Sequence, residues 1–487
     1  AIDEMANAGV KVASGNTVSM ATLKVQQARI EKAAGQYAAA LSHSKLAVKS
    51  LQSLVEIGID FKSAQPEYGI ALGLQTQLLE VTGDYVGAAN SAGKAVDLWQ
   101  KLVKENPAEI RYADGLATSQ IDAANVLRVA GRDPLEEYEA AVATFQRLVE
   151  LRPGIPRYRF NLATALSGLA WTKNRLAETE SAQASAVQSV NTLLFLSERF
   201  PEDIRFPLGE VSARLVLTEI LRDRGDFDLA VGIVEQASEA LRNEQIPSDS
   251  PQSRERFGEL LLVFGQVQSA IGDSPLAQDS FRQSAETLLE LAASDVGIPR
   301  HRDSAAWALY YLAHELVKAA DNTGAETAIK SAIEIRNDLP QRAAWLDSYA
   351  WLLLTAPIES LRDNSKAESL ALSAVQLTPK SPRFLRTLAM AQLRTGSLEP
   401  AAQSLKKAEV LMESEHPEQH LLLSMLAFKQ GDNDQARQLY TAGTALMEIA
   451  SPSNPRLLTM KREAAALIGI VVPVRKDLPD APAEPTN

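Results

Sequence analysis

The sequence predicts an all-α protein in which antiparallel helical hairpins stack into a right-handed superhelix. Three observations predict this class. An alanine-anchored helix start recurs along the chain, a proline-containing link recurs in phase with it, and alanine and leucine are abundant while β-branched and aromatic residues are comparatively sparse. Repetition at a fixed period is typical of a solenoid, in which each unit buries its apolar face against its neighbours. The chain has 487 residues, more than the roughly 250–300 at which a single core stops growing.

The second helix of each hairpin is expected to open with a small residue, because paired helices approach closely where one side chain is small. Gly or Asp marks the preceding turn in most units. The small residues are Ala40, Ala88, Ala140, Ala182, Ala230, Ala277, Ala325, Ala367, Ala401 and Ala436. We therefore expect ten hairpins. The pattern is weakest at Ala140, which follows an apparent insertion, and at Ala182, where no glycine marks the turn.

The first helix of a hairpin is expected to follow an extended link that contains proline, because proline breaks a preceding helix. An aromatic residue or histidine lies close to the start of that helix. Five segments share this pattern: Gln65–Tyr68, Asn106–Tyr112, Arg152–Tyr158, Phe200–Phe206 and Ile298–His301.

The spacing of the small residues divides the chain. The steps run from 42 to 52 residues as far as Ala367 and then tighten to 34 and 35. We expect stretched repeats with longer helices over 1–340, regular 34-residue units over 341–450 and a capping helix within 451–471. The segment 472–487, with four prolines and mixed charge, is expected to be a disordered tail.

The last third of the chain resembles the 34-residue tetratricopeptide repeat (TPR) in residue size and punctuation. That pattern requires, in order, a large, a large and a small residue, a turn residue, and then a small, a large and a small residue. In this sequence the seven positions are Leu385, Leu388, Ala389, Gly396, Ala401, Leu405 and Ala408. The next unit fills them with Leu423, Ser424, Ala427, Gly431, Ala436, Tyr440 and Gly443.

Two longer segments resemble the TPR regions of large bacterial Ser/Thr protein kinases of the planctomycete type. They are Ile155–Ala163 and Ala350–Pro357, the latter continuing to Pro379, and the opening Ala1–Met5 is similar to the stretch that follows the membrane span in such kinases. The resemblance implies that a kinase domain, if the parent protein has one, lies before residue 1, and in kinases of this layout the region after the membrane span lies outside the cytoplasm. Free-standing TPR proteins use the same units.

Composition narrows the possible partners. The net charge of −12 disfavours nonspecific binding to nucleic acid or anionic lipid. The absence of cysteine excludes disulfides, thiolate metal sites and cysteine nucleophiles. No run of about 18 apolar residues predicts a membrane span in this chain.

The chain lacks a catalytic constellation. His301–Asp303 spells the catalytic-loop triplet of protein kinases, but Ala308 stands where the required Asn should be. Asp226–Phe227 is followed by Asp228 where the metal-binding triplet needs Gly, and no glycine-rich phosphate loop occurs. We expect no enzymatic activity and no cofactor.

His416 and His420 have the i, i+4 spacing of a metal-binding pair. Pro417 lies between them at an expected helix start, and only Glu415 and Glu418 could supply a third ligand. A solvated helix end is the favoured interpretation, so no metal site is predicted.

The candidate binding residues follow from the TPR resemblance, which places inward-facing positions on the first helix of each hairpin. Carried onto this sequence, these positions are Trp171, Asn174, Trp307, Tyr310, His314, Arg383, Arg386, Met390, Met425 and Phe428, and Arg394 shares the helix of Arg383. Aromatic and Arg side chains commonly anchor interfaces. Packing of the aromatic residues against the next repeat is the alternative.

Arg383 and Arg386 are expected to be exposed on a common helix face. With Arg394 they would attract an acidic segment or a free C-terminal carboxylate, because Arg holds such groups by paired hydrogen bonds. The sequence thus predicts a scaffold that binds a protein or peptide. The alternative is a structural subunit of an envelope or organelle assembly that acts through self-association.

Overall fold

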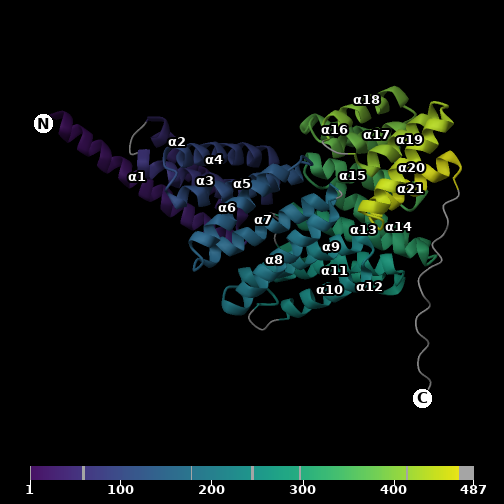
Figure 1. The fold of residues 1–487 in the computed structure, drawn as a ribbon, viewed down its shortest axis with the longest axis horizontal. Helices are drawn as coiled ribbons and strands as arrows, with labels where there is room; N and C mark the ends of the chain where they lie inside the picture. Colours follow the sequence, from purple (N-terminus) through teal and green to yellow (C-terminus); the bar gives the residue numbers. More distant parts are fainter. Residues whose placement is uncertain are drawn as a thin grey trace, which may run out of the picture.

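The computed structural model describes residues 2–57, 61–176, 178–242, 246–294, 298–412 and 415–470. Every regular element within these ranges is helical and none is a strand, which confirms the predicted all-α superhelical repeat. Helices α1 to α20 form ten successive hairpins, and α21 follows them (Figure 1). The segment 472–487 lies outside the described residues.

The helices of the first six hairpins are α1 (Ile2–Ala33), α2 (Tyr37–Ile57), α3 (Phe61–Val81), α4 (Tyr85–Glu105), α5 (Ile110–Val129), α6 (Leu135–Leu151), α7 (Pro156–Arg175), α8 (Thr179–Arg199), α9 (Arg205–Arg224), α10 (Phe227–Leu241), α11 (Pro251–Ile271) and α12 (Ser274–Ser294). The remaining helices are α13 (Pro299–Lys318), α14 (Asn322–Asn337), α15 (Ala343–Thr355), the 3₁₀ turn η1 (Glu359–Leu361), α16 (Asn364–Leu377), α17 (Pro382–Thr395), α18 (Leu398–Val410), α19 (Pro417–Lys429), α20 (Asn433–Ala450) and α21 (Pro455–Ile468).

Two local features start the second helix of a hairpin. An aspartate often caps it: the side chain of Asp84 accepts a hydrogen bond from the Gly87 amide at 3.1 Å, and Asp321 does the same with Gly324 at 2.9 Å. Four residues after the cap comes the small residue. Nine of the ten predicted alanines, all except Ala140, have no exposed surface.

The assignment of Ala140 as an anchor is wrong. Tyr138 occupies the equivalent position four residues after the cap and is 1% exposed, whereas Ala140 is only partly buried. Helix α7, the first helix of the next hairpin, supplies a small residue at this contact, because a Cβ on Gly168 would lie 2.3 Å from the Tyr138 ring. The space for this large residue therefore comes from the neighbouring hairpin, α7–α8.

The expected extended link around Pro66 is also wrong. Pro66 lies inside α3, which begins at Phe61. Beyond the first turn of a helix, proline removes one backbone hydrogen bond and its ring crowds the carbonyl four residues earlier, so Pro66 disfavours the helix at this point. The burial of Tyr68, Ala71 and Leu72 on the following turns holds this segment in the helix.

Helix length decreases toward the C-terminus. Second helices before residue 340 have 15 to 21 residues, for example 21 in α4 and 15 in α10, whereas α16 and α18 have 14 and 13. The exception is α20, with 18 residues. The division of the chain into two kinds of repeat at about residue 340 stays a prediction.

Adjacent first helices are joined by polar contacts between residues about one repeat apart. Lys32 Nζ donates to Gln77 Oε1 at 2.5 Å, and Gln77 Nε2 donates to Asp122 Oδ1 at 3.1 Å, so that α1, α3 and α5 are linked in series. Further along, Tyr310 and Thr355 share a hydrogen bond of 2.9 Å between their hydroxyl groups. These contacts lie on the inner face of the superhelix.

The superhelix winds far enough for distant hairpins to touch. The Ser381 hydroxyl at the start of α17 donates to the Gly131 carbonyl between α5 and α6, at 3.0 Å. Likewise Trp345 at the start of α15 packs edge-on against Tyr85, with ring centroids 6.0 Å apart. The N-terminal hairpins therefore support the C-terminal ones, although more than 200 residues separate them. None of the described helices is long and apolar enough to cross a bilayer.

Candidate functional site

Two adjoining cavities lie between the first helices and α21. The central cavity has a volume of about 450 Å³ and is lined mainly from α7, α9, α11, α13 and α21. The C-terminal cavity has about 760 Å³ and is lined mainly from α15, α17, α19 and α21. His314, Thr459 and Arg462 line both. We call the two together the inner channel.

Aromatic rings form the wall of the central cavity. Trp307 packs edge-on against Tyr310, with centroids 5.4 Å apart, and Tyr310 packs against the His314 ring at 4.6 Å. On the opposite helices, guanidinium groups stack on the other tryptophans: Arg175 lies 4.9 Å from the Trp171 ring and Arg456 lies 3.7 Å from the Trp351 ring.

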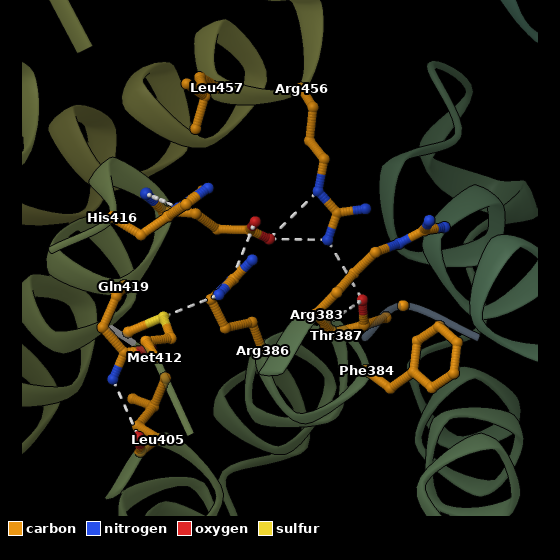
Figure 2. Close-up of polar contacts among 12 residues, drawn as sticks. Arg383, Phe384, Arg386, Thr387, Leu405, Met412, His416, Gln419, Arg456 and Leu457 are labelled. Atoms are coloured by element: carbon orange, nitrogen blue, oxygen red, sulfur yellow. Dashed lines mark hydrogen bonds and ion pairs between the residues drawn. The ribbon is translucent and has the colours of Figure 1, made fainter. Parts of the chain in front are cut away.

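A cluster of charged side chains joins α17, α19 and α21 beside this wall (Figure 2). Glu418 lies 3.1 Å from Arg386 Nε and 2.6 Å from Arg456 Nη2. Burial opposes ionisation of Glu418, but the two guanidinium groups outweigh it and hold its pKa well below the usual range. Arg456 also donates to the Thr387 hydroxyl at 3.2 Å, so the carboxylate fixes α21 onto the inner face.

Positive charge is in excess around the cluster. Arg383 lies 2.8 Å from the fully buried Asp347, whose oxygens accept no hydrogen bond from the described residues, so this contact is electrostatic. Arg175 makes no ion pair in the part of the chain that the structure describes. The side chain of Arg175 is exposed to the channel; desolvation by the surrounding helices, together with the nearby Arg383 and Arg456, lowers its pKa to about 10. An anion in the cavity would relieve this repulsion.

The channel as a whole is basic. The lining of the two cavities contains nine Lys and Arg residues: Arg175, Arg222, Lys318, Arg362, Arg383, Arg394, Lys429, Arg456 and Arg462. It contains four carboxylates: Glu219, Glu315, Glu359 and Glu463. The chain carries a net charge of −12, so the inner channel is a local exception.

The structure brings seven of the predicted residues to the channel. Trp171, Trp307, Tyr310 and Arg383 line the central cavity, Met425 and Arg394 line the C-terminal one, and His314 lines both. Burial lowers the pKa of His314 to about 4, so its ring is neutral at pH 7. Asn174, Arg386, Met390 and Phe428 line neither cavity.

The expected exposure of the arginines is wrong for Arg386, which is 5% exposed and engaged with Glu418. Arg383 is only partly exposed because Asp347 draws it inward. Arg394 donates from Nε to Glu463 at 2.8 Å. The acidic partners of all three arginines come from other helices of the chain, so these residues are not the free anion-binding set that the sequence predicts.

Met390 and Met425 are buried, at 0% and 2% exposure, and Phe428 packs against the same C-terminal core. For Met390 and Phe428, packing explains the side chain, and Met425 packs in the same core at the edge of the C-terminal cavity. Asn174 is 8% exposed and its amide donates to Asp223 at 3.2 Å. The position-by-position transfer from the TPR pattern therefore identified core residues along with channel residues.

Sequence reasoning missed Arg175, Arg456 and Arg462. Arg175 lies four residues after Trp171 on α7, so the spacing that identifies one inward position also identifies the other. Arg456 and Arg462 lie on α21, which belongs to no hairpin and therefore has no repeat register to indicate its inward face.

In the structure, residues of the kinase-like triplet and of the histidine pair make contacts that hold helices α13 and α19 in place. His301–Asp303 lies in the first turns of α13, where Asp303 accepts a hydrogen bond from Arg336. His416 caps α19, its Nδ1 accepting from the Glu418 amide at 3.2 Å. His420 Nε2 lies 3.6 Å from Glu415.

A further hollow of about 870 Å³ runs along one side of α8, beside Val187 and Phe195. It is wide and shallow, and it has neither the aromatic wall nor the charge excess of the inner channel. The inner channel is therefore the candidate functional site.

No protein-family model and no curated protein matches this chain. Solved structures of similar arrangement include a Rap protein complexed with competence and sporulation factor, which is 13% identical with a TM-score of 0.46 over 80% of this chain and 97% of that chain. Yeast Tom70 is 14% identical with a TM-score of 0.39, over 86% and 96%. A tetratricopeptide repeat protein from Parabacteroides merdae is 12% identical with a TM-score of 0.34, over 62% and 99%. All three TM-scores lie below 0.5, and the helices of the chain itself show an all-α superhelical repeat.

Proposed function

We propose that this chain is a non-catalytic protein-interaction scaffold whose inner channel binds an acidic segment of a partner protein. The observation that carries the proposal is the excess of positive charge in the channel, whose lining has nine basic and four acidic residues. Three carboxylates outside the lining, Asp223, Asp347 and Glu418, pair with lining arginines, so a smaller excess remains. A stacked array of hairpins provides a long inner surface of the kind that solenoid proteins use for binding. The binding residues are those whose guanidinium groups are still available, Arg175 and Arg462, together with the tryptophans beside them.

The proposal is tested with a labelled peptide that carries several glutamates and a matched peptide in which glutamine replaces each of them. Fluorescence anisotropy should show binding of the acidic peptide only, with an affinity that falls as salt increases. The double variant Arg175→Glu with Arg462→Glu should weaken binding at least tenfold. The control is Arg147→Glu with Arg437→Glu, which makes the same charge change at exposed positions of α6 and α20. Equal binding by both double variants would contradict the proposal.

Ile155–Ala163 and Ala350–Pro357 resemble kinase-associated TPR regions, and this supports a scaffold role within a larger kinase. In a parent kinase the scaffold would hold the kinase domain near the bound partner. The coding sequence upstream of Ala1 tests this: a kinase domain followed by a membrane span supports the parentage, and their absence from the full reading frame removes it.

A further inference from the structure

A separate cavity of about 400 Å³ lies among the N-terminal hairpins, bounded by α1, α3, α4, α5 and α7. It shares no lining residue with the inner channel. Its floor is made by Trp99, which fills the space that side chains at Gly69 and Gly115 would otherwise take. We call it the N-terminal cavity.

Three acceptor oxygens in this cavity have no donor among the described residues: Asp114 Oδ1, Thr118 Oγ1 and Asp122 Oδ2. Asp114 and Asp122 are 5% and 6% exposed. Buried acceptors without partners are costly, so each indicates either a ligand or a destabilised site.

The other oxygen of each carboxylate is already occupied. Arg157 pairs with Asp114 Oδ2, and Gln77 donates to Asp122 Oδ1 while it accepts from Lys32. Lys32 and Arg157 also line the cavity, but the contacts that they make leave Asp114 Oδ1 and Asp122 Oδ2 without a donor. A Cβ on Gly73 would stand 3.4 Å from Asp122 Oδ2, so the small residue leaves this oxygen accessible.

The free groups form a row along one face of α5. Arg111, Asp114, Thr118 and Asp122 are spaced by three, four and four residues and all line the cavity. Arg111 makes no ion pair with the described part of the chain. In order, the row offers a cation, an anion, a hydroxyl group and a second anion, with the two carboxylates about 12 Å apart along the helix axis. Ile70 and Leu74 of α3 supply an apolar wall beside it.

We propose that the N-terminal cavity binds a free α,ω-diamino acid of the lysine type. The ligand's carboxylate pairs with Arg111, its α-ammonium group donates to Asp114 and Thr118, and its aliphatic chain lies along Ile70 and Leu74. The terminal ammonium group donates to Asp122. This order of charges matches the row on α5, and each free oxygen gains a charge-assisted hydrogen bond. The cavity's volume lies within the range of small-molecule sites.

Isothermal titration calorimetry on the full chain tests the proposal with four probes that differ by one group each. Lysine carries all three charged groups, norleucine lacks the terminal ammonium, 6-aminohexanoate lacks the α-ammonium and 1,5-diaminopentane lacks the carboxylate. Lysine should bind at least tenfold more tightly than each of the others. Equal affinity for lysine and norleucine, or no lysine binding at millimolar concentration, would overturn the proposal.

Two variants locate the contacts. Asp122→Asn should abolish the preference for lysine over norleucine, and Arg111→Gln should abolish the preference for lysine over 1,5-diaminopentane. Burial raises the pKa of Asp122 to about 7, above the 3.8 of an exposed aspartate, although Gln77 and Lys32 oppose this. The folded state therefore loses stability as the pH rises from about 4 to 7, and Asp122→Asn should unfold at the same temperature or higher at pH 8. A stable Asp122→Asn variant that keeps the preference for lysine would also overturn the proposal.

Discussion

The carboxylate of Glu418 joins three helices, α17, α19 and α21, through a single side chain. It is 3% exposed and accepts hydrogen bonds from Arg386 of α17 and Arg456 of α21. A buried ion pair contributes little compared with a well-packed apolar pair, but loss of one partner leaves the others charged and unpaired. At this position two guanidinium groups depend on one carboxylate.

Glu418→Gln should therefore lower the free energy of unfolding by about 3–5 kcal/mol at pH 7. The arginines hold the pKa of Glu418 below that of the unfolded chain, so the stability that it contributes is present above about pH 4.5 and is lost as the pH falls further. The difference between parent and variant should shrink between pH 5 and pH 3. Urea unfolding at these pH values measures it, with the exposed Glu409→Gln as control. A variant as stable as the parent at pH 7 would contradict this account.

At the scale of helices, the contact between α6 and α7 of neighbouring hairpins shows that a large residue on one helix is accommodated by a small residue on the next. In the other hairpins the second helix supplies the small residue. Here Tyr138 is large, its hydroxyl donates to Asn125 at 2.7 Å, and Gly168 on α7 makes room for the ring. Overpacking such a contact forces side chains out of their favoured rotamers.

Gly168→Ala should cost about 1–3 kcal/mol of unfolding free energy because its new methyl group would meet the Tyr138 ring. The cost should be much smaller in a Tyr138→Leu background, where the ring is gone, so the double-mutant cycle gives a coupling energy of about 1 kcal/mol or more. Denaturant titration of the four proteins measures it. Additive effects would show that the two residues are independent. Gly232→Ala on α10, where nothing lies within 4 Å of the added Cβ, serves as the control.

At the scale of the molecule, hairpins that are far apart in the sequence contact each other across successive windings of the superhelix. Solenoid units ordinarily contact only adjacent units. In this chain Trp345 reaches the turn between α3 and α4, and a Cβ on Gly83 would stand 2.6 Å from its ring. Arg342 lies 3.8 Å from Asp84 at the same place.

Trp345→Ala should loosen the contact between windings without unfolding the hairpins. We expect an increased radius of gyration by small-angle X-ray scattering and faster amide exchange in the turn around Gly83, with unchanged helicity by circular dichroism. Leu229→Ala, at an exposed position that is 59% accessible, should change none of these. If exchange around Gly83 stays at the parent's rate, the windings do not depend on this contact.

The sequence by itself determined the hairpins, because the signals that build a hairpin are local. Caps such as Asp84, small anchors such as Ala88 and helix-starting prolines such as Pro156 act within a few residues, and the fold class follows from their repetition. The sequence also identified part of the inner channel, including Trp171 and Trp307, since inward positions on a first helix follow its register. Whether these residues bind a partner stays a prediction.

The tertiary structure alone decided which charges are free. The spacing of Arg386 from Arg383 on α17 predicts an exposed side chain. In the folded chain it is buried and paired with Glu418 of the next hairpin. The same holds for α21, whose Arg456 and Arg462 enter the channel from a helix outside the repeat pattern. Ion pairs between windings and across hairpins depend on positions 30 or more residues apart, and helical periodicity carries information over only a few turns.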